Sequence, residues 1–457
     1  MSGKLAHKVY IQRTAAVMAA ASIFLFLNVV QALAQSGGSN SSYSQVGMGL
    51  LNDESQGWNR AMGGVGVALP SGNRLNTMNP ASYAYIDSLS FILDVGMSGS
   101  FGRMSNQTSS KNIRNASFDY IIAGFRLRRH LGLSFGFKPY SSIGYDFTST
   151  DGNVYRDNIT GEIVKSSSEH RGSGGLRKAF AGIGWRPFSG LSLGMHVNIL
   201  WGGYTHILMH GFTISNSNGF NYIENASITT YQLDFGAQYA LRLSRKDWLT
   251  IGATVALGHK YGGDGMLLRF MDSGDTLTVN IDKDAFDLPM KYSGGLGWQH
   301  KNNLLVSADY TYTGWGNCRI PTMIATTEGV TYHSLKGSYR NNSQIRAGVE
   351  WTPNPTALHG YLNRVKYRMG LSYATPHLAF ADKETGKGPS ETTLSIGAGF
   401  PINNVINRTR GLFPVINVGM QWLRRAPADK SLVTENYFVI NLGVTFNERW
   451  FMKYKIQ

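Results

Sequence analysis

The stretch RAMGGVGVALPSGNRLNTMNPASYA, residues 60–84, is the first candidate for binding chemistry because its glycines resemble a phosphate-binding loop. Gly63, Gly64 and Gly66 permit tight turns and a close approach of the backbone to another group. The spacing lacks the third glycine of a dinucleotide loop, and no Lys-Ser or Lys-Thr pair follows as in a P-loop. A nucleotide site is therefore not predicted. A plain linker, or a segment folded into something hollow, are the remaining interpretations.

Histidines and carboxylates do not group into a metal or catalytic site. On a strand, His206 and His210 would share a face but lie about 13 Å apart, too far for one metal ion. The acidic segments 272–275 and 282–287 lack the spacing of an EF-hand loop, so we expect a solvated loop there. Neither Gly-x-Ser-x-Gly nor His-Glu-x-x-His occurs. We predict no enzyme activity, no bound metal and no cofactor.

The first 34 residues have the organisation of a secretory signal peptide. A basic start precedes the apolar run 15–30, and small residues at 32–34 fit a cleavage site, so Gln35 is predicted to begin the mature chain. A retained membrane anchor is the alternative, but the apolar run is short for a span and contains two polar residues.

The chain is basic, with a formal net charge of +15, of which three positive charges lie in the signal segment and +12 remains. This excess favours outer-membrane lipid headgroups and the phosphates of lipopolysaccharide, and we expect no nucleic acid partner for an exported chain. Cys318 is the only cysteine, so no internal disulfide forms.

From residue 89 onward, apolar residues alternate with small or polar residues, so that each strand would have one apolar and one polar face. In LGLSFGFKPY, residues 131–140, every second residue from Leu131 to Phe137 is apolar, and YQLDFGAQYALRL, residues 231–243, repeats the pattern. Strand side chains point to opposite faces with period two. Such runs last about 10 residues, which matches a membrane-crossing strand.

About fourteen such segments occur, which predicts an all-β fold: a transmembrane antiparallel barrel over 89–457. They lie near 89–102, 116–128, 131–147, 174–186, 191–208, 229–243, 248–262, 288–299, 303–315, 342–351, 365–376, 391–400, 412–424 and 434–446. Short connections alternate with long polar ones, as in outer-membrane barrels, and an even count places both termini in the periplasm of a Gram-negative bacterium. A soluble sandwich is the alternative.

Aromatic and polar residues have the positions that such a barrel needs. An interfacial aromatic girdle is predicted from Trp185, Trp248, Trp298, Trp315, Trp351 and Trp422, all near proposed strand ends. Within lipid, the backbone groups at the edge of an open sheet would have no hydrogen-bond partners, so the sheet must close into a barrel. A barrel of this size encloses a lumen. Polar residues predicted to face this lumen are Asp94, Arg126, Arg186, Asp234, Arg242, Arg346 and Glu350.

The segment 35–88 is too long for a simple lead-in and lacks alternation, so we predict a plug in the lumen. Asn79 is predicted to cap a short helix that begins at Pro80 and runs to Ile86. A plain linker remains the alternative.

A Gly-rich GGVGVA followed by NPA, between a signal peptide and a barrel, resembles the FadL-type transporters of long-chain fatty acids and other hydrophobic compounds. The closing NLGVTFNERWFMKYKI is similar to the last strand of FadL-like and PorV-like proteins. The resemblance implies a fourteen-stranded barrel with an N-terminal hatch. The matching hatch residues are Gly63, Gly64, Gly66, Asn79, Pro80 and Ala81.

The resemblance also implies lateral release of a hydrophobic ligand through a gap made by a kink in the third strand. Pro139 lies in the third proposed strand, so Lys138, Pro139 and Tyr140 are predicted to mark a lateral gate. The polar outside loops and polar lumen depart from an acyl-chain pocket. Two other functions therefore stay open: a PorV-like secretion-associated scaffold that binds a partner protein, and a porin for polar solutes.

Overall fold

The computed structural model describes residues 40–88, 90–156, 163–212, 220–271, 276–326, 329–357, 359–380, 386–402 and 414–449. The predicted signal peptide and the C-terminal residues 450–457 lie outside these ranges. No helix within them is long and apolar enough to span a membrane.

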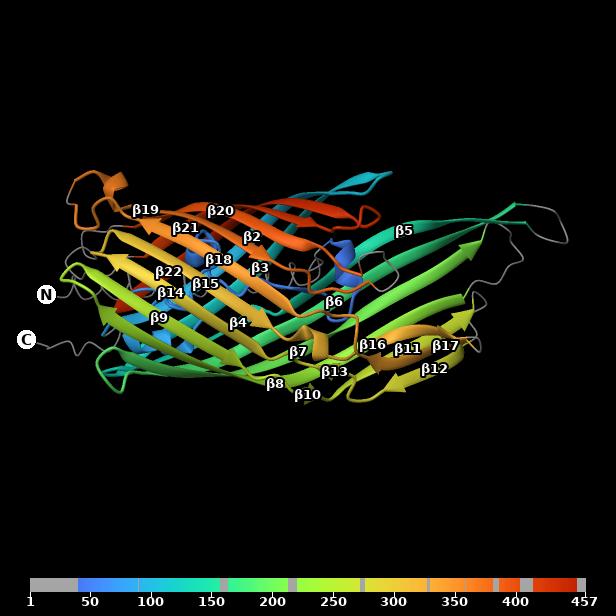
Figure 1. Ribbon diagram of the computed structural model, residues 1–457, viewed down its shortest axis with the longest axis horizontal. Helices are drawn as coiled ribbons and strands as arrows, with labels where there is room; N and C mark the ends of the chain where they lie inside the picture. The colour runs from blue at the N-terminus through green and yellow to red at the C-terminus, as the bar shows by residue number, and fades with distance from the viewer. Residues whose placement is uncertain are drawn as a thin grey trace, which may run out of the picture.

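The main sheet is a closed antiparallel barrel (Figure 1). It closes where β2 pairs with β22, from Ser90↔Arg449 to Ser105↔Thr434. Because β4 and β5 together form one wall strand, the wall has fourteen strands, which confirms the predicted fold and count. The wall strands are β2 (Ser90–Ser105), β3 (Ser110–Arg128), β4 (Leu131–Pro139), β5 (Ser141–Arg156), β6 (Ile163–Trp185), β7 (Leu191–Phe212), β8 (Phe220–Arg242), β9 (Asp247–Ala256), β14 (Lys291–His300), β15 (Leu304–Thr313), β18 (Asn342–Trp351), β19 (Lys366–Ala374), β20 (Ser390–Pro401), β21 (Val415–Ala426) and β22 (Thr434–Arg449).

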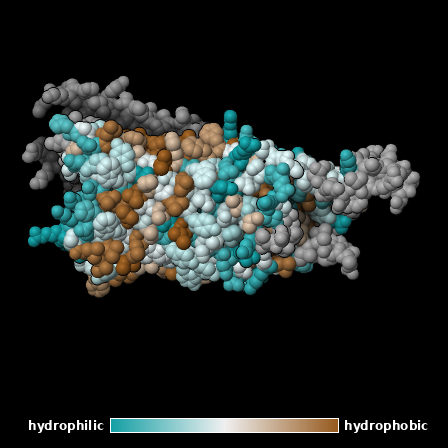
Figure 2. Space-filling model, turned by 45° about the horizontal axis from the view of Figure 1, so that its top comes forward, coloured by the Kyte–Doolittle hydropathy of each residue, from teal (hydrophilic) through white to brown (hydrophobic). Residues whose placement is uncertain are grey.

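One end of the barrel, on the left in Figure 1, carries the short turns, and we call it the short-turn end. On β7, the apolar side chains of Leu193, Met195, Val197 and Ile199 are exposed in the half of the strand nearest this end. Figure 2 shows brown apolar side chains gathered over the left half, with mostly white and teal ones to the right. The apolar band therefore covers only about ten residues of each long strand, those nearest the short-turn end, as a membrane crossing requires.

Strands β5 to β8 continue far beyond this band, and the sequence did not predict that continuation. β6, β7 and β8 have 23, 22 and 23 residues. Several segments expected to be loops also form strands: β11 (Gly263–Met271), β12 (Thr276–Asp282), β13 (Phe286–Asp287), β16 (Ile320–Thr326) and β17 (Gly329–Leu335). β10 (Lys260–Tyr261) lies within the proposed segment 248–262 but is a separate strand that pairs with β13. β11 pairs with β8 and β12, which extends the wall into a sheet beyond the barrel.

Residues 40–88 lie inside the barrel, and we call them the plug. They contain the 3-10 helix η1 (Ser42–Gln45), strand β1 (Leu50–Leu51), helix α2 (Gly57–Arg60) and the 3-10 helix η2 (Pro80–Tyr85). The Asn79 side chain accepts a hydrogen bond from Ala81 N, and Pro80 begins η2, which confirms the predicted cap. Two further 3-10 helices, η3 (Trp315–Asn317) and η4 (Tyr361–Arg364), lie in connections between wall strands.

Wall glycines allow the plug backbone to approach closely. A Cβ on Gly348 would lie 2.1 Å from Met62 O, and one on Gly252 would lie 2.2 Å from Val67 O. Gly194 and Gly132 stand in the same way against Pro80 and Tyr83. The small side chains of the inward face are therefore required by the plug, and a larger residue there would overlap it.

The tryptophans divide into two groups. Trp185, Trp248, Trp298 and Trp351 are exposed near strand ends at the short-turn end, and Trp422 is exposed on β21, in agreement with the predicted positions. The prediction for Trp315 is wrong, because this side chain is buried in η3 and packs on Tyr339. It belongs to an apolar cluster that also contains Tyr43 and Met48 of the plug.

Candidate functional site

A cavity of about 1290 Å³ lies between the plug and the wall. Its plug side is formed by Leu50 to Glu54, and its wall side includes the end of β4 and the edge of β3. Phe118, Phe137 and Ile143 contribute apolar surface, while lysine and carboxylate side chains contribute charge. A molecule with an apolar body would thus meet both kinds of surface here.

The third wall strand is interrupted beside this cavity. β4 ends at Pro139, which has no N–H to donate, and β5 begins at Ser141. Tyr140 N still donates to Leu176 O of β6 at 2.8 Å. On the other side, Tyr140 O accepts from Asn52 N of the plug at 2.9 Å. The residue therefore lacks the ordinary pairing on both sides that would have excluded a break at this position.

Beyond the interruption, the described residues of β3 and β5 do not pair with each other. β3 pairs with β4 only from Ile121↔Phe137 to Arg128↔Leu131. In the described part of the wall, the stretch Ser110–Tyr120 pairs with β2 alone. Figure 1 shows the β2–β3 hairpin and β5 spreading apart toward the right. We call this gap the seam.

The plug crosses the seam on its inner side. Leu50 and Leu51 pair with Ser142 and Ser141, so β1 takes the place beside β5 that a wall strand would otherwise hold. At the opposite edge, Asn40 Nδ2 donates to Arg114 O at 3.2 Å. The plug thus provides hydrogen-bond partners for the wall backbone at both edges of the seam, through the backbone of β1 and the side chain of Asn40.

Glycines bend the neighbouring strands at the same level. Gly174 and Gly175 on β6 have φ of 126° and 134°, and Gly202 on β7 has φ of 148°. A Cβ on Gly175 would lie 2.4 Å from Ser141 O. Because L-residues rarely adopt these angles, glycine is needed for β6 and β7 to follow the bend of β5.

Three lysines of the wall surround one carboxylate of the plug. Glu54 Oε1 lies 3.0 Å from Lys178 Nζ, Oε2 pairs with Lys291 Nζ, and Lys138 Nζ donates to Glu54 O at 3.3 Å. Burial alone would raise the pKa of Glu54, but the three ammonium groups outweigh it and hold the pKa well below its usual range. Glu54 is therefore ionised and holds the plug against the wall.

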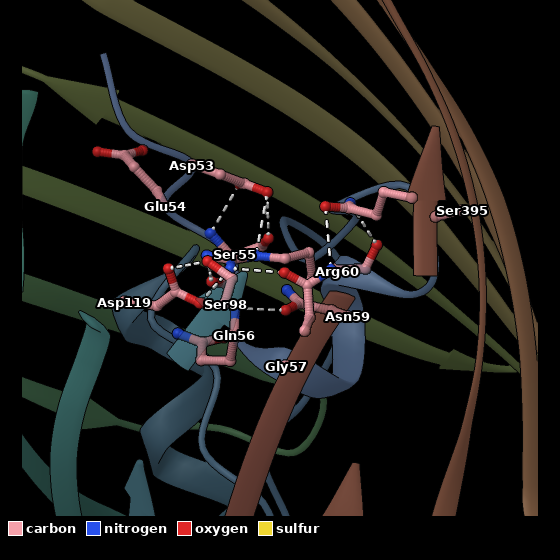
Figure 3. A network of polar contacts seen from close by, with 12 residues as sticks. Asp53, Glu54, Ser55, Gln56, Gly57, Asn59, Arg60, Ser98, Asp119 and Ser395 are labelled. Atoms are coloured by element: carbon pink, nitrogen blue, oxygen red, sulfur yellow. Dashed lines mark hydrogen bonds and ion pairs between the residues drawn. The ribbon is translucent and has the colours of Figure 1, made fainter. Parts of the chain in front are cut away.

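A second polar network holds helix α2, as Figure 3 shows. Arg60 Nη1 lies 2.6 Å from Asp119 Oδ2 and donates to Asn441 Oδ1 at 3.1 Å. Arg60 Nε lies 3.4 Å from Asp53 Oδ2. Burial raises the pKa of Asp53, but Arg60 and Arg346 lower it by more, so its pKa falls below the usual range.

The residues predicted as a hatch motif come together within the plug. Gly63 and Gly64 have φ of 71° and 79°, a turn that favours glycine. Gly66 N and the next amide both donate to Asp309 Oδ2 of β15, at 2.6 and 3.0 Å. Asn79 Nδ2 donates to Val67 O at 2.8 Å, so the Gly-rich and Asn-Pro-Ala parts of the motif contact each other.

The sequence model of the BamG family matches residues 17–457. This chain belongs to the BamG family. No curated protein matches the sequence with significance.

The BamG-family barrel has the fold of FadL-type outer-membrane barrels. The Pseudomonas putida toluene transporter TodX superposes with a TM-score of 0.59 at 16% identity, covering 88% of this chain and 100% of TodX. The Ralstonia pickettii toluene transporter TbuX gives 0.56 at 16% identity, covering 86% and 99%. A Pseudomonas aeruginosa FadL homologue gives 0.57 at 13% identity, covering 88% and 99%. At these identities the likeness concerns the fold alone.

Four of the predicted lumen residues face the inside of the BamG-family barrel, where three are buried and Asp234 is half-buried. Asp234 accepts from Asn198 Nδ2 at 2.9 Å, and Asp94 accepts from Tyr120 OH at 3.3 Å. Glu350 lies 2.7 Å from Arg74 Nη1 of the plug and equally far from Arg368 Nε. The fourth, Arg346, lines the cavity. These residues therefore hold the plug or face the cavity.

The other three predicted lumen residues lie at the rim of the short-turn end. Arg242 is exposed at the last position of β8, and Arg126 near the end of β3 donates to Arg128 O. Arg186 follows β6 and stacks on Tyr85. The alternation predicted which face of the strand these residues occupy. It did not predict their position along the barrel axis, where the strands end.

Several residues of the BamG-family site were missed from the sequence. Lys178 and Lys291 occupy inward positions of β6 and β14, so the alternation carried a signal for them. Glu54 and Arg60 lie in the plug, where no periodic pattern predicts which way a side chain points. Among the described residues, no three His, Cys, Asp or Glu side chains form a group that could hold a metal ion.

Proposed function

We propose that this chain is an outer-membrane transporter that passes small hydrophobic molecules through the cavity and out of the seam into the membrane. The observation that carries the proposal is the loss of β3–β5 pairing beside the cavity, where β1, Ser44 and Asn40 of the plug contact the strand edges. The similar solved structures of TbuX and TodX, which are toluene transporters, support the ligand class.

The route requires movement of only a short part of the plug. Glu350 and Asp309 hold the plug on the side of β14 to β22, and Arg60 holds it to Asp119 on the β3 edge of the seam. The strand that lies along the β5 edge, β1, contributes only two paired residues. The free energy of a hydrophobic molecule falls when it moves from water into lipid. Displacing two paired residues is therefore a smaller barrier than displacing the whole plug.

A porin for polar solutes is the weaker interpretation, because the plug fills the lumen and is hydrogen-bonded to the wall around it. Planar-bilayer conductance separates the two. We expect the protein to stay near the conductance of a bare bilayer, and a steady large open pore would support the porin instead.

The decisive experiment measures uptake of tritiated toluene and tritiated oleate into cells that carry Ala116→Trp. Ala116 is exposed on the unpaired stretch of β3 and lines the cavity, so an indole there narrows the seam. We expect uptake to fall several-fold. Ala308→Trp is the matched control, because Ala308 is exposed on β15 with paired strands on both sides. Equal uptake by the two variants would refute lateral release.

A further inference from the structure

Positive charge is concentrated at the short-turn end of the barrel. The turn between β3 and β4 contributes Arg129, the connection after β6 contributes Arg186, and the turn between β8 and β9 contributes Arg245 and Lys246. Lys301 follows from the turn between β14 and β15. The excess of positive charge in the whole sequence therefore has a definite location.

Two arginines at the opposite end have acidic partners. Arg319 lies 3.0 Å from Asp287, and Arg425 lies 2.9 Å from Glu391 and 3.3 Å from Glu435. Across the ranges that the structure describes, Arg186, Arg245, Lys246 and Lys301 form no ion pair with a carboxylate. These four cations of the short-turn end are thus not neutralised by an ion pair, whereas Arg319 and Arg425 are.

These four cations line a cavity of about 530 Å³ in the mouth of the short-turn end. Pro70 and Tyr85 of the plug form its floor, Trp248 and Thr250 form one side, and no acidic side chain lines it. Thr250 is buried and faces the barrel interior, so the cavity opens along the barrel axis rather than toward the surrounding lipid. We call it the basic cup.

The Arg186 side chain and the backbone of two turns of the basic cup are held in place. The Arg186 guanidinium stacks on Tyr85 with 5.0 Å between its carbon and the ring centre, and its Nε donates to His130 Nδ1 at 2.9 Å. Lys301 N donates to Lys246 O, which joins two turns of the rim. The cations therefore stand on fixed turns, which lowers the entropy lost on binding.

The acidic residue nearest in sequence does not neutralise the cup. Asp247 accepts from Ser244 Oγ at 2.6 Å and contacts His300 Nδ1 at 2.7 Å, so its carboxylate is already engaged. Partial loss of solvent, together with Arg186, Arg129 and Arg126, lowers the pKa of His130. This direction is the one expected in a field of unneutralised positive charge.

We propose that the basic cup is a docking site for an acidic polypeptide segment of a periplasmic partner protein. Two arginines offer paired donors that match carboxylates, and two lysines add point charges. The aromatic rings of Tyr85 and Trp248 provide apolar surface beside them. The cup faces the aqueous mouth, so a protein chain reaches it more directly than a lipid headgroup does. This docking is independent of lateral transport.

The test uses the whole protein in a neutral detergent and a short fluorescein-labelled peptide of alternating Glu and Asp. We expect saturable binding that weakens with salt, and the triple variant R245E/K246E/K301E should weaken it by at least about tenfold. The control K283E/K336E/K430E reverses three cations at the other end and should leave binding unchanged. Equal loss in both variants, or no binding at all, overturns the proposal.

Carbodiimide cross-linking locates the bound peptide. We expect its carboxylates to join Lys246 and Lys301, and cross-links confined to lysines at the other end would refute the site. Vesicles of phosphatidylglycerol form the second arm of the test. If the triple variant reduces vesicle binding but not peptide binding, the cup serves lipid and the docking proposal fails. Toluene uptake by the same variant reports on transport separately and should remain at the native rate.

Discussion

Gly63 of the plug lies so close to Gly370 of β19 that a Cβ on Gly370 would stand 2.1 Å from Gly63 N. The same wall glycine would meet Met62 C at 2.1 Å. The plug backbone and the wall are thus in direct contact on this side, with no side chain between them. Opposite, across the cavity, the wall is interrupted at Tyr140, and the plug touches it through the short strand β1.

Gly370→Ala should destabilise the protein by about 1–3 kcal/mol, since the added methyl overlaps a backbone that cannot move without loss of its hydrogen bonds. Gly294→Ala is the matched control, because nothing lies within 4 Å of a Cβ at that position. Urea unfolding in detergent micelles measures both free energies. Equal values would show that the plug is not seated as described.

Glu54→Gln should free the plug near β5 and cost about 1–3 kcal/mol, less than a fully buried pair because the Glu54 side chain is 28% exposed. Lys178, which is buried, would lose its carboxylate partner. Limited proteolysis of the plug and urea unfolding measure the effect. Glu169→Gln breaks a more exposed pair with Arg171 and should change stability by less than about 1 kcal/mol.

The same carboxylate predicts a dependence of stability on pH. The pKa of Glu54 is lowered in the folded protein from its ordinary value of 4.5, so the folded state prefers the ionised form. Its contribution is therefore complete above pH 4.5 and declines as the pH falls below that value toward the folded pKa. The free energy of unfolding, measured from pH 7 downward, should fall less in Glu54→Gln than in the native protein. Parallel curves would contradict the assignment.

The sequence predicted the barrel well because alternation reports which residues face lipid, and every wall segment proposed from it became a strand. Pro139 also marked the break, because a missing N–H is visible in sequence. Three features were not predicted. The continuation of β6 to β8 beyond the membrane has the same alternation, but its outward residues are less apolar, so the pattern is weaker there. Trp315 lies in a connection that folds back onto the plug. The partners of Glu54 depend on how the plug lies in the barrel, and the plug sequence has no periodic pattern that predicts this.

Cys318 should react very slowly with maleimides in the folded protein. It is buried, and burial together with the nearby Asp287 raises the pKa of its thiol from 9.0 to about 12. Since the thiolate is the reactive form, labelling should be on the order of a thousandfold slower than at an ordinary thiol. Ser109→Cys in a Cys318→Ser background gives the exposed reference. Comparable rates at the two sites would show that the cluster around Trp315 opens readily.

A disulfide between the plug and β21 separates lateral release from passage past a displaced plug. A Cβ on Gly419 would lie 3.5 Å from Ala61 Cβ, within the range for a disulfide, so Ala61→Cys/Gly419→Cys should cross-link when made in a Cys318→Ser background. The link holds α2 against the wall but leaves Leu50 and Leu51 free at the seam.

Toluene uptake by the oxidised protein should therefore stay within about twofold of its reduced form, because the proposed exit needs movement of β1 only. Ala68→Cys/Gly297→Cys provides a second link at a separate point of the plug, with 3.6 Å between the corresponding positions. It should behave in the same way. If oxidation of either pair stops uptake and a reductant restores it, the substrate travels through a space that opens only when the plug leaves the wall, and the seam is then a feature of the fold rather than the exit.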